Sequence, residues 1–218
     1  MCGIFAVIGS REVSSIIIDG LRKLEYRGYD SAGIATIDNS NNDQIEKLNI
    51  IKSKGKLINL SNLIKEKPPK GYVGIGHTRW ATHGKPNERN SHPHLDSSAQ
   101  IAVVQNGIIE NYRDLSKSLK LKGIKFTSET DTEIIPHLIG LELEQSLANG
   151  LSPNGQTLLM AVQKVLTLLE GTYAIAVIWS KAPNALVVAS GKAPLVLGFG
   201  EGEFFCASDT PALAEFTR

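Results

Sequence analysis

The stretch Tyr173-Ala-Ile-Ala-Val-Ile-Trp179 is apolar along its length and has no polar side to offer solvent. A strand that is apolar on both faces has to be covered on both faces. Strand-like runs gather toward the two ends of the chain, and helical patterns lie in its middle. This order predicts sheets that are sandwiched between layers of helices.

Short apolar runs bounded by Gly, Pro or polar residues predict the strands, and apolar residues at helical spacing predict the helices. Pro136 fits its helix only in the first turn, because a later proline would break the helix. A polar turn is expected at 39–43, and the strand that starts at Ile101 is expected to end at Asn106-Gly107. Strands are predicted at 3–8, 32–37, 45–51, 73–78, 101–105, 173–179, 185–190, 195–199 and 203–207, and helices at 13–24, 57–65, 112–122, 132–145 and 157–169.

The composition excludes several classes of partner. Lys and Arg (23) nearly balance Asp and Glu (22), and a net charge of +1 gives no electrostatic footprint for nucleic acid or an anionic membrane. The first apolar run is too short for a signal peptide, and no later run approaches the ~20 residues of a membrane span. Two cysteines, far apart in sequence, argue against a disulfide framework. We therefore expect a cytoplasmic protein with one domain over 1–218.

Cys2 stands between Met1 and Gly3, which is the first chemically informative feature of the sequence. Methionine before a small side chain is a good substrate for aminopeptidase, and its removal would leave Cys2 with a free α-amine. Such an amine has a pKa of about 7.7–8.0, so near neutral pH it can accept the proton of the thiol in its own residue. This is one form of an activated nucleophile. Taken alone, a cysteine here is more often only the first residue of a strand.

The loop at 77–84, His-Thr-Arg-Trp-Ala-Thr-His-Gly, follows directly on a predicted strand. Arg79 offers a planar fork of donors that suits a carboxylate. The loop therefore predicts a site for an anionic group. Further donors and an aromatic cover for a ligand stand in the same loop: Thr78, Trp80, Thr82 and His83.

The histidines of this loop and of His92-Pro-His94 also allow a metal site. Their spacing is a weak signal, and no cluster of cysteines or carboxylates completes a ligand set. We expect no metal and no cofactor. Cys206 lies in an apolar strand and is expected to be a buried core residue without a chemical role.

Two further features have both a structural and a chemical interpretation. Asn106-Gly107 is a strong turn signal, but it can equally present a side-chain amide and a backbone N–H to one point, as an oxyanion hole requires. Asp131 stands at the start of a predicted helix, where it would cap the helix or bind a cationic amine. The residues alone leave both alternatives open.

Together these motifs resemble the glutaminase domain of the glutamine:fructose-6-phosphate amidotransferase family, which are N-terminal-nucleophile hydrolases. The resemblance covers essentially the whole chain, and the motifs follow in the expected order. It implies an α+β fold, a four-layer αββα sandwich of two mainly antiparallel sheets. The motifs that carry it are Cys2, Arg27-Gly-Tyr-Asp-Ser-Ala-Gly33, the loop at 77–84, Asn106-Gly107 and Ser128-Glu-Thr-Asp-Thr-Glu133.

The resemblance also implies the chemistry of the site. Cys2 would attack the side-chain amide carbon of L-glutamine, with its own α-amine as the base. Asn106 and Gly107 would hold the tetrahedral oxyanion. Ammonia would leave, and hydrolysis of the thioester would give glutamate.

The remaining residues are implied to bind the substrate or to support the site. Arg79, with Thr82 and His83, would bind the α-carboxylate of glutamine, and Asp131 its α-ammonium group. The implied role of Trp80 is to belong to the loop that closes over glutamine. That of Arg27 is to brace the N-terminus.

Members of this family continue into two isomerase lobes, which bind fructose 6-phosphate and use the ammonia. Those lobes are absent here, and we expect the chain to stop short of the end of the glutaminase domain. The full-length protein is expected to form a homo-oligomer. Gln105 stands where family members often carry His, and we expect this difference to tune the site at most.

Two alternatives remain open at this point. The chain could be the amidotransferase domain of a protein with another acceptor, such as the phosphoribosyl compound of amidophosphoribosyltransferase. It could also be a non-catalytic module that keeps the fold, if Met1 stays in place, because Cys2 would then have a peptide nitrogen instead of an amine.

Overall fold

The computed structural model describes residues 2–38, 47–81 and 84–217. Within these residues the strands form two sheets, in which all neighbouring strands pair antiparallel. The larger sheet has the order β3-β2-β4-β1-β10-β9, and the smaller one has the order β5-β6-β7-β8. The strands are β1 (Gly3–Ile8), β2 (Ser31–Asp38), β3 (Lys47–Lys54), β4 (Val73–Arg79), β5 (His94–Leu95), β6 (Ile101–Ile109), β7 (Gly171–Trp179), β8 (Val187–Gly191), β9 (Val196–Phe199) and β10 (Phe204–Ala207).

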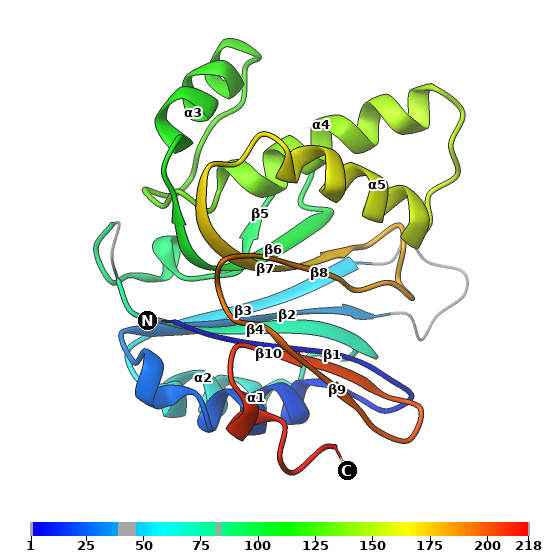
Figure 1. The fold of residues 1–218 in the computed structure, drawn as a ribbon. Coiled ribbons are helices and arrows are strands. Elements are labelled where there is room, and N and C mark those ends of the chain that lie inside the picture. The colour runs from blue at the N-terminus through cyan, green and yellow to red at the C-terminus, as the bar shows by residue number, and fades with distance from the viewer. Residues whose placement is uncertain (1, 39–46, 82–83, 218) are drawn as a thin grey trace.

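The two sheets face each other, and helices cover both outer faces (Figure 1). Helices α1 and α2 lie under the larger sheet, and α3, α4 and α5 lie over the smaller one. This arrangement confirms the expected four-layer αββα sandwich. None of the helices in the described ranges is both long and apolar enough to cross a membrane. The helices are α1 (Ser14–Arg22), α2 (Leu57–Glu66), α3 (Tyr112–Leu121), α4 (Ile134–Ala148) and α5 (Gly155–Leu166).

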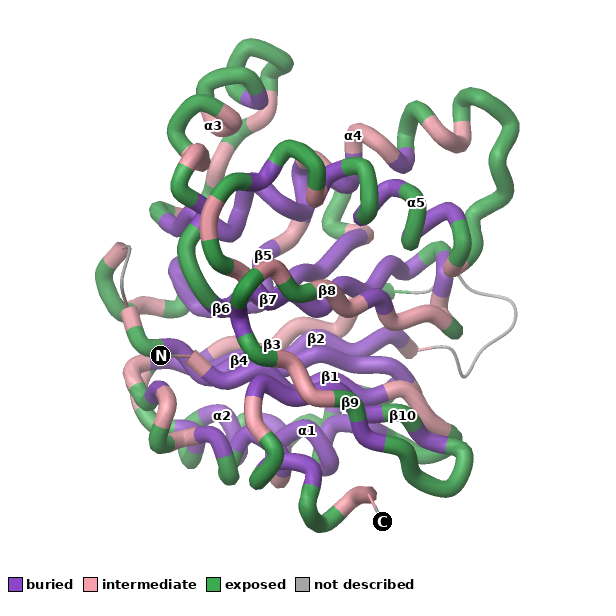
Figure 2. Tube along the Cα trace, in the orientation of Figure 1, coloured by how far each residue is buried: buried purple, intermediate pink, exposed green. Residues whose placement is uncertain are grey.

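The core has one apolar layer between the sheets and one under each helical layer. Strand β7 contributes to two of them, because alternate residues of a strand point to opposite faces. The inter-sheet layer receives Ala174, Ala176 and Ile178, and the layer under the helices receives Ile175, Val177 and Trp179. The prediction that β7 is covered on both faces is therefore confirmed, and Figure 2 shows the central strands β1, β2, β4, β6 and β7 buried along most of their length.

Most predicted elements are confirmed, but the end predicted for β6 is wrong. The strand was expected to stop at Asn106-Gly107, and instead it runs through that pair to Ile109, in register with β7. Pairing with β7 outweighs the local turn preference of Asn-Gly. Gly107 meets the conformational demand of this position, because its φ is +104°.

Two smaller differences concern the strands β5 and β3. The two-residue strand β5 was not predicted, because it is too short to show a pattern. The third strand, predicted at 45–51, extends to Lys54, and positions 45 and 46 lie outside the described residues. The polar turn expected at 39–43 lies outside the described residues.

Cys206 is buried between the sheets, as predicted, and burial raises the pKa of its thiol to about 12.

The backbone of His92 lies close against β2 of the larger sheet. A Cβ atom on Gly33 of β2 would lie 2.2 Å from the carbonyl oxygen of His92. No side chain fits at this distance, so only glycine lets the His92 backbone pass over β2. His92 in turn contacts residues of the smaller sheet, as described below.

The variant Gly33→Ala should therefore lower the free energy of unfolding by about 1–3 kcal/mol, because the added methyl group meets backbone atoms that cannot rotate away. Gly140→Ala, on α4, is the matched control: its Cβ would have ordinary contacts at 3.5 Å. This control should be neutral or up to about 1 kcal/mol more stable, because alanine favours the helix. Urea unfolding of both variants tests the prediction, and equal effects would contradict it.

Candidate active site

Cys2 immediately precedes β1, a strand that lies between β4 and β10 in the larger sheet. Its carbonyl oxygen accepts two hydrogen bonds, from Arg27 Nε (3.0 Å) and from Asn106 Nδ2 (3.0 Å). Its sulfur lies 3.3 Å from the backbone nitrogen of Trp80, which donates to it. The position of the thiol is therefore set by residues from both sheets.

Burial raises the pKa of the Cys2 thiol, and the hydrogen bond from Trp80 offsets this effect only in part. The group is therefore protonated at neutral pH. A thiol in this state is a weak nucleophile until a base removes its proton.

Arg27 connects the start of β1 to the segment after β10. Besides its bond to Cys2, its guanidinium group forms an ion pair with Asp209 at 3.0 Å. Asp209 also accepts a hydrogen bond from Tyr26 (2.5 Å). The Arg27 side chain is 10% exposed and that of Asp209 is 33% exposed, so water reaches this contact mainly from the carboxylate side.

His77, on β4, orients the side chain of Asn106. Its Nε2 lies 3.0 Å from the carbonyl oxygen of Gln105 and 3.1 Å from Asn106 Oδ1. A carbonyl oxygen only accepts, so Nε2 carries the proton and donates to both oxygens. Asn106 Oδ1 is therefore the acceptor of this contact, and the amide nitrogen of Asn106 points toward Cys2.

Three buried histidines lie together beside this contact. His77 and His92 stack with ring centroids 4.1 Å apart, and His94 meets His92 edge to face. Burial lowers the pKa of His77 to about 3, and it also lowers the pKa values of His92 and His94 well below the usual range. All three rings are therefore neutral. Within the described residues, no group of three or more His, Cys, Asp or Glu side chains is arranged to hold a metal ion.

Gly107 follows Asn106 on β6 and cannot be replaced by a larger residue. A Cβ atom at this position would lie 2.0 Å from the carbonyl oxygen of Thr172 on β7. Its positive φ also disfavours any other residue. The backbone of β6 thus bends next to Cys2 while it keeps its pairing with β7.

Arg79 and Asp131 approach the same place from different elements. Arg79 ends β4, is 3% exposed, and donates from Nη2 to the carbonyl oxygen of Gly84 (3.3 Å). Asp131 is 4% exposed, and its Oδ2 accepts from the backbone nitrogen of Ile109 on β6 (2.8 Å). A buried cation and a buried carboxylate therefore lie on the walls of one pocket.

This pocket brings together most of the residues predicted from sequence. Asn106 and Arg27 adjoin the pocket, because both donate hydrogen bonds to the carbonyl oxygen of Cys2. Thr82 and His83 lie outside the described residues. The residues that line the pocket are Cys2, Arg79, Trp80, His92, Gln105, Gly107, Thr130, Asp131 and Thr132.

Sequence reasoning missed several polar residues of the site. His77 and His92 were considered only as metal ligands, and Thr132 was given no role. Thr132 donates to Gln105 Oε1 (2.6 Å), and His92 Nδ1 accepts from the backbone nitrogen of Gln105 (3.2 Å). No local pattern marks these contacts, because each joins segments that are far apart in the sequence.

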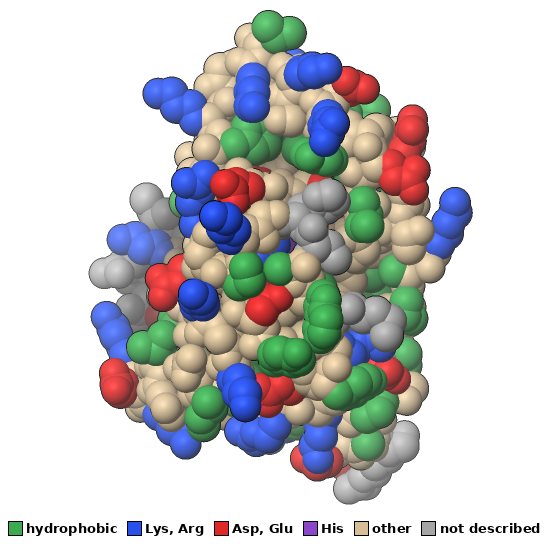
Figure 3. Space-filling view, turned by 90° about the vertical axis from the view of Figure 1, so that its left-hand side faces the viewer, with side chains coloured by type: hydrophobic (Ala, Val, Ile, Leu, Met, Phe, Trp, Pro, Cys, Tyr) green, Lys and Arg blue, Asp and Glu red, His purple; other side chains and the backbone are tan. Residues whose placement is uncertain are grey.

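Around the pocket, the molecular surface has no dominant charge. Figure 3 shows acidic and basic side chains interspersed with apolar ones over the described part of this face. Trp80 is 46% exposed and meets Tyr29 edge to face, with ring centroids 5.4 Å apart. The entrance therefore has an aromatic rim over a polar interior.

A cysteine before a central strand, facing an Asn-Gly pair of the opposite sheet in an αββα sandwich, defines an amidotransferase of the N-terminal-nucleophile class. Comparison with solved structures agrees. The chain aligns over 97% of its length with a glutamine phosphoribosylpyrophosphate amidotransferase from B. subtilis complexed with ADP and GMP (TM-score 0.78, 28% identity, 43% of that chain). It aligns equally far with a structure described as the allosteric regulatory enzyme of purine biosynthesis (TM-score 0.80, 29% identity, 43% of that chain).

The chain belongs to the glutamine amidotransferase domain family, whose model matches residues 77–215. It is 53% identical over its whole length to the glutamine--fructose-6-phosphate aminotransferase [isomerizing] of Thermosynechococcus vestitus, and 51% identical to that of Nostoc sp.. In both cases it covers 33% of the relative, so the chain spans about a third of the length of the curated relatives that it matches.

The neutral state of His77 makes stability depend on pH. Its pKa is about 3 in the folded chain and about 6.5 when unfolded, so between these values the unfolded state binds the proton. The free energy of unfolding should fall as the pH drops below about 6.5, by up to ~1.4 kcal/mol per pH unit from this residue.

His77→Phe keeps an aromatic ring against His92 and removes the titrating group. Urea unfolding between pH 4.5 and 6.5 should therefore show a shallower slope for the variant, by up to one proton. In the native chain, 15N NMR of labelled histidine should show the His77 proton on Nε2. Equal slopes, or a proton on Nδ1, would contradict the assignment.

Proposed function

We propose that this chain hydrolyses L-glutamine to glutamate and ammonia, with Cys2 as the nucleophile. The observation that carries the proposal is the placement of Cys2 beside the Asn106 amide group, which His77 orients, in a pocket that also presents Arg79 and Asp131. Membership of the glutamine amidotransferase domain family supports it.

The nucleophile requires that Met1 be removed, so that Cys2 carries a free α-amine. The amine takes the thiol proton, and the sulfur attacks the side-chain amide carbon of glutamine. When the carbon–nitrogen bond breaks, the proton goes to the leaving nitrogen and ammonia departs. Water then attacks the thioester carbon, which releases glutamate and restores the thiol.

The oxyanion of each tetrahedral intermediate would lie between Asn106 Nδ2 and the backbone N–H of Gly107. Donors fixed in place before the reaction stabilise such a charge without reorganisation, and loss of one donor typically costs about 10²–10³ in kcat. His77 supports this role, because it engages the oxygen of the Asn106 amide and leaves the nitrogen to donate.

Glutamine would be bound through its α-carboxylate and α-ammonium groups. Arg79, with Thr82 and His83, would bind the α-carboxylate, and Asp131 would bind the α-ammonium group. The pocket has a volume of about 20 Å³, which is room for about one water molecule. Glutamine therefore enters only after residues at the rim move, and Trp80, which is half exposed at the mouth, would then cover the bound substrate.

We propose further that the chain is the glutaminase part of a longer cytoplasmic protein. Its ammonia would pass to fructose 6-phosphate on C-terminal isomerase domains to form glucosamine 6-phosphate, in a homo-oligomer. The relatives at 53% and 51% identity favour this acceptor. A phosphoribosyl acceptor has less support, because the matching structure is 28% identical.

The nucleophile can be tested by intact-protein mass spectrometry before and after treatment with 6-diazo-5-oxo-norleucine, a glutamine analogue that alkylates such thiols. We expect a mass without Met1 that gains one adduct, which maps to Cys2. Cys2→Ala should gain none and lose hydrolysis, while its affinity for glutamine remains largely intact. Retention of Met1 with no adduct would instead support the non-catalytic module.

The carboxylate role of Arg79 has its own test. In Arg79→Lys a point charge replaces the planar fork, so binding loses a charge-assisted hydrogen bond. KM for glutamine should rise about 10- to 100-fold, while kcat changes much less. Steady-state kinetics separate the two constants, and an effect wholly on kcat would show that Arg79 does not bind the carboxylate.

A further inference from the structure

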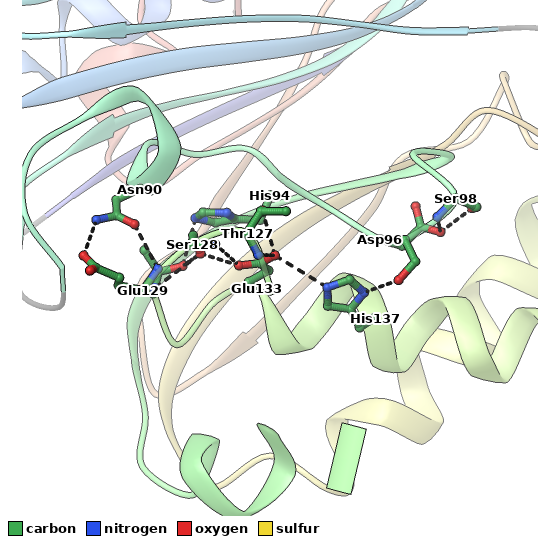
Figure 4. A network of polar contacts seen from close by, with 11 residues as sticks. Asn90, His94, Asp96, Ser98, Thr127, Ser128, Glu129, Glu133 and His137 are labelled. Carbon is green, nitrogen blue, oxygen red and sulfur yellow. Dashed lines mark hydrogen bonds and ion pairs between the residues drawn. The ribbon is translucent and has the colours of Figure 1, made fainter. Parts of the chain in front are cut away.

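Glu133, two residues after Asp131, has a buried carboxylate that binds the other end of the segment in which Asp131 lies. Glu133 is 1% exposed and immediately precedes α4. Its Oε1 accepts from the nitrogen (2.7 Å) and the hydroxyl group (2.9 Å) of Thr127, and its Oε2 accepts from the nitrogen (2.6 Å) and the hydroxyl group (2.5 Å) of Ser128. Figure 4 shows both residues turned toward the carboxylate.

These contacts are strong enough to keep Glu133 ionised. Burial alone would raise the pKa of its carboxyl group, but the contacts with His137, Ser128 and Thr127 outweigh burial and hold the pKa well below its usual range. Hydrogen bonds to a charged acceptor are about twice as strong as neutral ones. Glu133 therefore holds the two ends of segment 127–133 together across the whole neutral pH range.

Side-chain hydrogen bonds also fix the rest of this segment, which belongs to no helix or strand. Thr130 contacts His94 Nε2 at 2.9 Å, and the backbone nitrogen of Glu129 donates to Asn90 Oδ1 at 2.9 Å. Asp131 lies between these anchors and Glu133, with one carboxylate oxygen on the backbone nitrogen of Ile109. Small shifts of the segment therefore move Asp131 relative to the pocket.

On its other side Glu133 adjoins a cavity of about 460 Å³ rather than the apolar core. Lys52 of β3 lines this cavity and interacts electrostatically with Glu133. His137 lies one helical turn further along α4, with Nε2 3.6 Å from Glu133 Oε1 and Nδ1 3.3 Å from Ser97 Oγ. A cavity rather than packed side chains adjoins this side of the segment. The position of the segment therefore depends on the Glu133 hydrogen bonds more than on packing.

We infer that Glu133 is a positioning residue of the glutaminase site, which holds segment 127–132 so that Asp131 meets the α-ammonium group of glutamine. The inference rests on the proposed role of Asp131. Glu133 would not contact the substrate, because both of its carboxylate oxygens are engaged by Thr127 and Ser128.

The test compares glutamine with glutaramate, which is glutamine without the α-amino group, as a competitive inhibitor. In Glu133→Gln, KM for glutamine should rise about tenfold, the size of one lost charge-assisted contact, while the inhibition constant of glutaramate changes less than twofold. Glu144→Gln, an exposed position on the same helix, is the matched control and should behave as the native chain.

Asp131→Asn separates this inference from the proposed function. It should weaken glutamine and spare glutaramate, and the double variant Asp131→Asn, Glu133→Gln should lose no more than Asp131→Asn alone. If Asp131→Asn weakens both ligands equally, the proposed ammonium role of Asp131 fails. If Asp131→Asn discriminates but Glu133→Gln weakens both ligands, or neither, the positioning role of Glu133 fails.

If Glu133→Gln does not fold, the variant Ser128→Ala provides a second test of the inference. It removes one of the four donors and leaves the charge of Glu133 in place. KM for glutamine should rise two- to fivefold, again without a change for glutaramate. An unchanged KM in this variant would overturn the inference.

Discussion

At the carbonyl oxygen of Cys2, a hydrogen bond joins the start of the larger sheet to the smaller sheet. This oxygen accepts one hydrogen bond from Arg27, which lies in the 3₁₀ turn between α1 and β2, and one from Asn106 of the smaller sheet. Both donors leave the thiol side of Cys2 open to the pocket. If either sheet shifted relative to the other, Cys2 and the amide group of Asn106 would separate, so the site depends on how the sheets pack.

The layer between the sheets combines small side chains with branched ones such as Ile4, Ile75 and Ile178. Ala6 and Ala174 belong to the inter-sheet layer, together with Ala102 and Ala176. At the end of this apolar layer, His77 spans the gap and donates to Gln105 and Asn106. The site is therefore the polar end of the inter-sheet core.

The sequence predicts the parts of this arrangement that local patterns encode. The apolar faces of 173–179 indicate a sheet that is covered on both faces. The position of Cys2 allows a nucleophile, but by itself it fits the start of a strand better, and only the other motifs favour the chemical role. The course of β6 could not be predicted, because Asn106-Gly107 favours a turn locally and only pairing with β7 overrides it. The contact of His77 with Asn106 joins two strands that are far apart in the sequence, and no local periodicity records it.

The titration states of the pocket restrict which group can activate Cys2. Among the described residues that line it, His92 is held neutral by burial, and its Nδ1 already accepts from Gln105. His77 lies close by, but its Nε2 is a donor, and burial lowers its pKa to about 3, so it cannot take a proton from the thiol near pH 7. Asp131 is engaged with Ile109, and the guanidinium group of Arg79 only donates hydrogen bonds. An α-amine on Cys2, with an ordinary pKa of about 7.7–8.0, is matched to the task and lies in the same residue as the sulfur. The electrostatics of the buried histidines are thus consistent with the base proposed above, the α-amine that Cys2 would carry after removal of Met1.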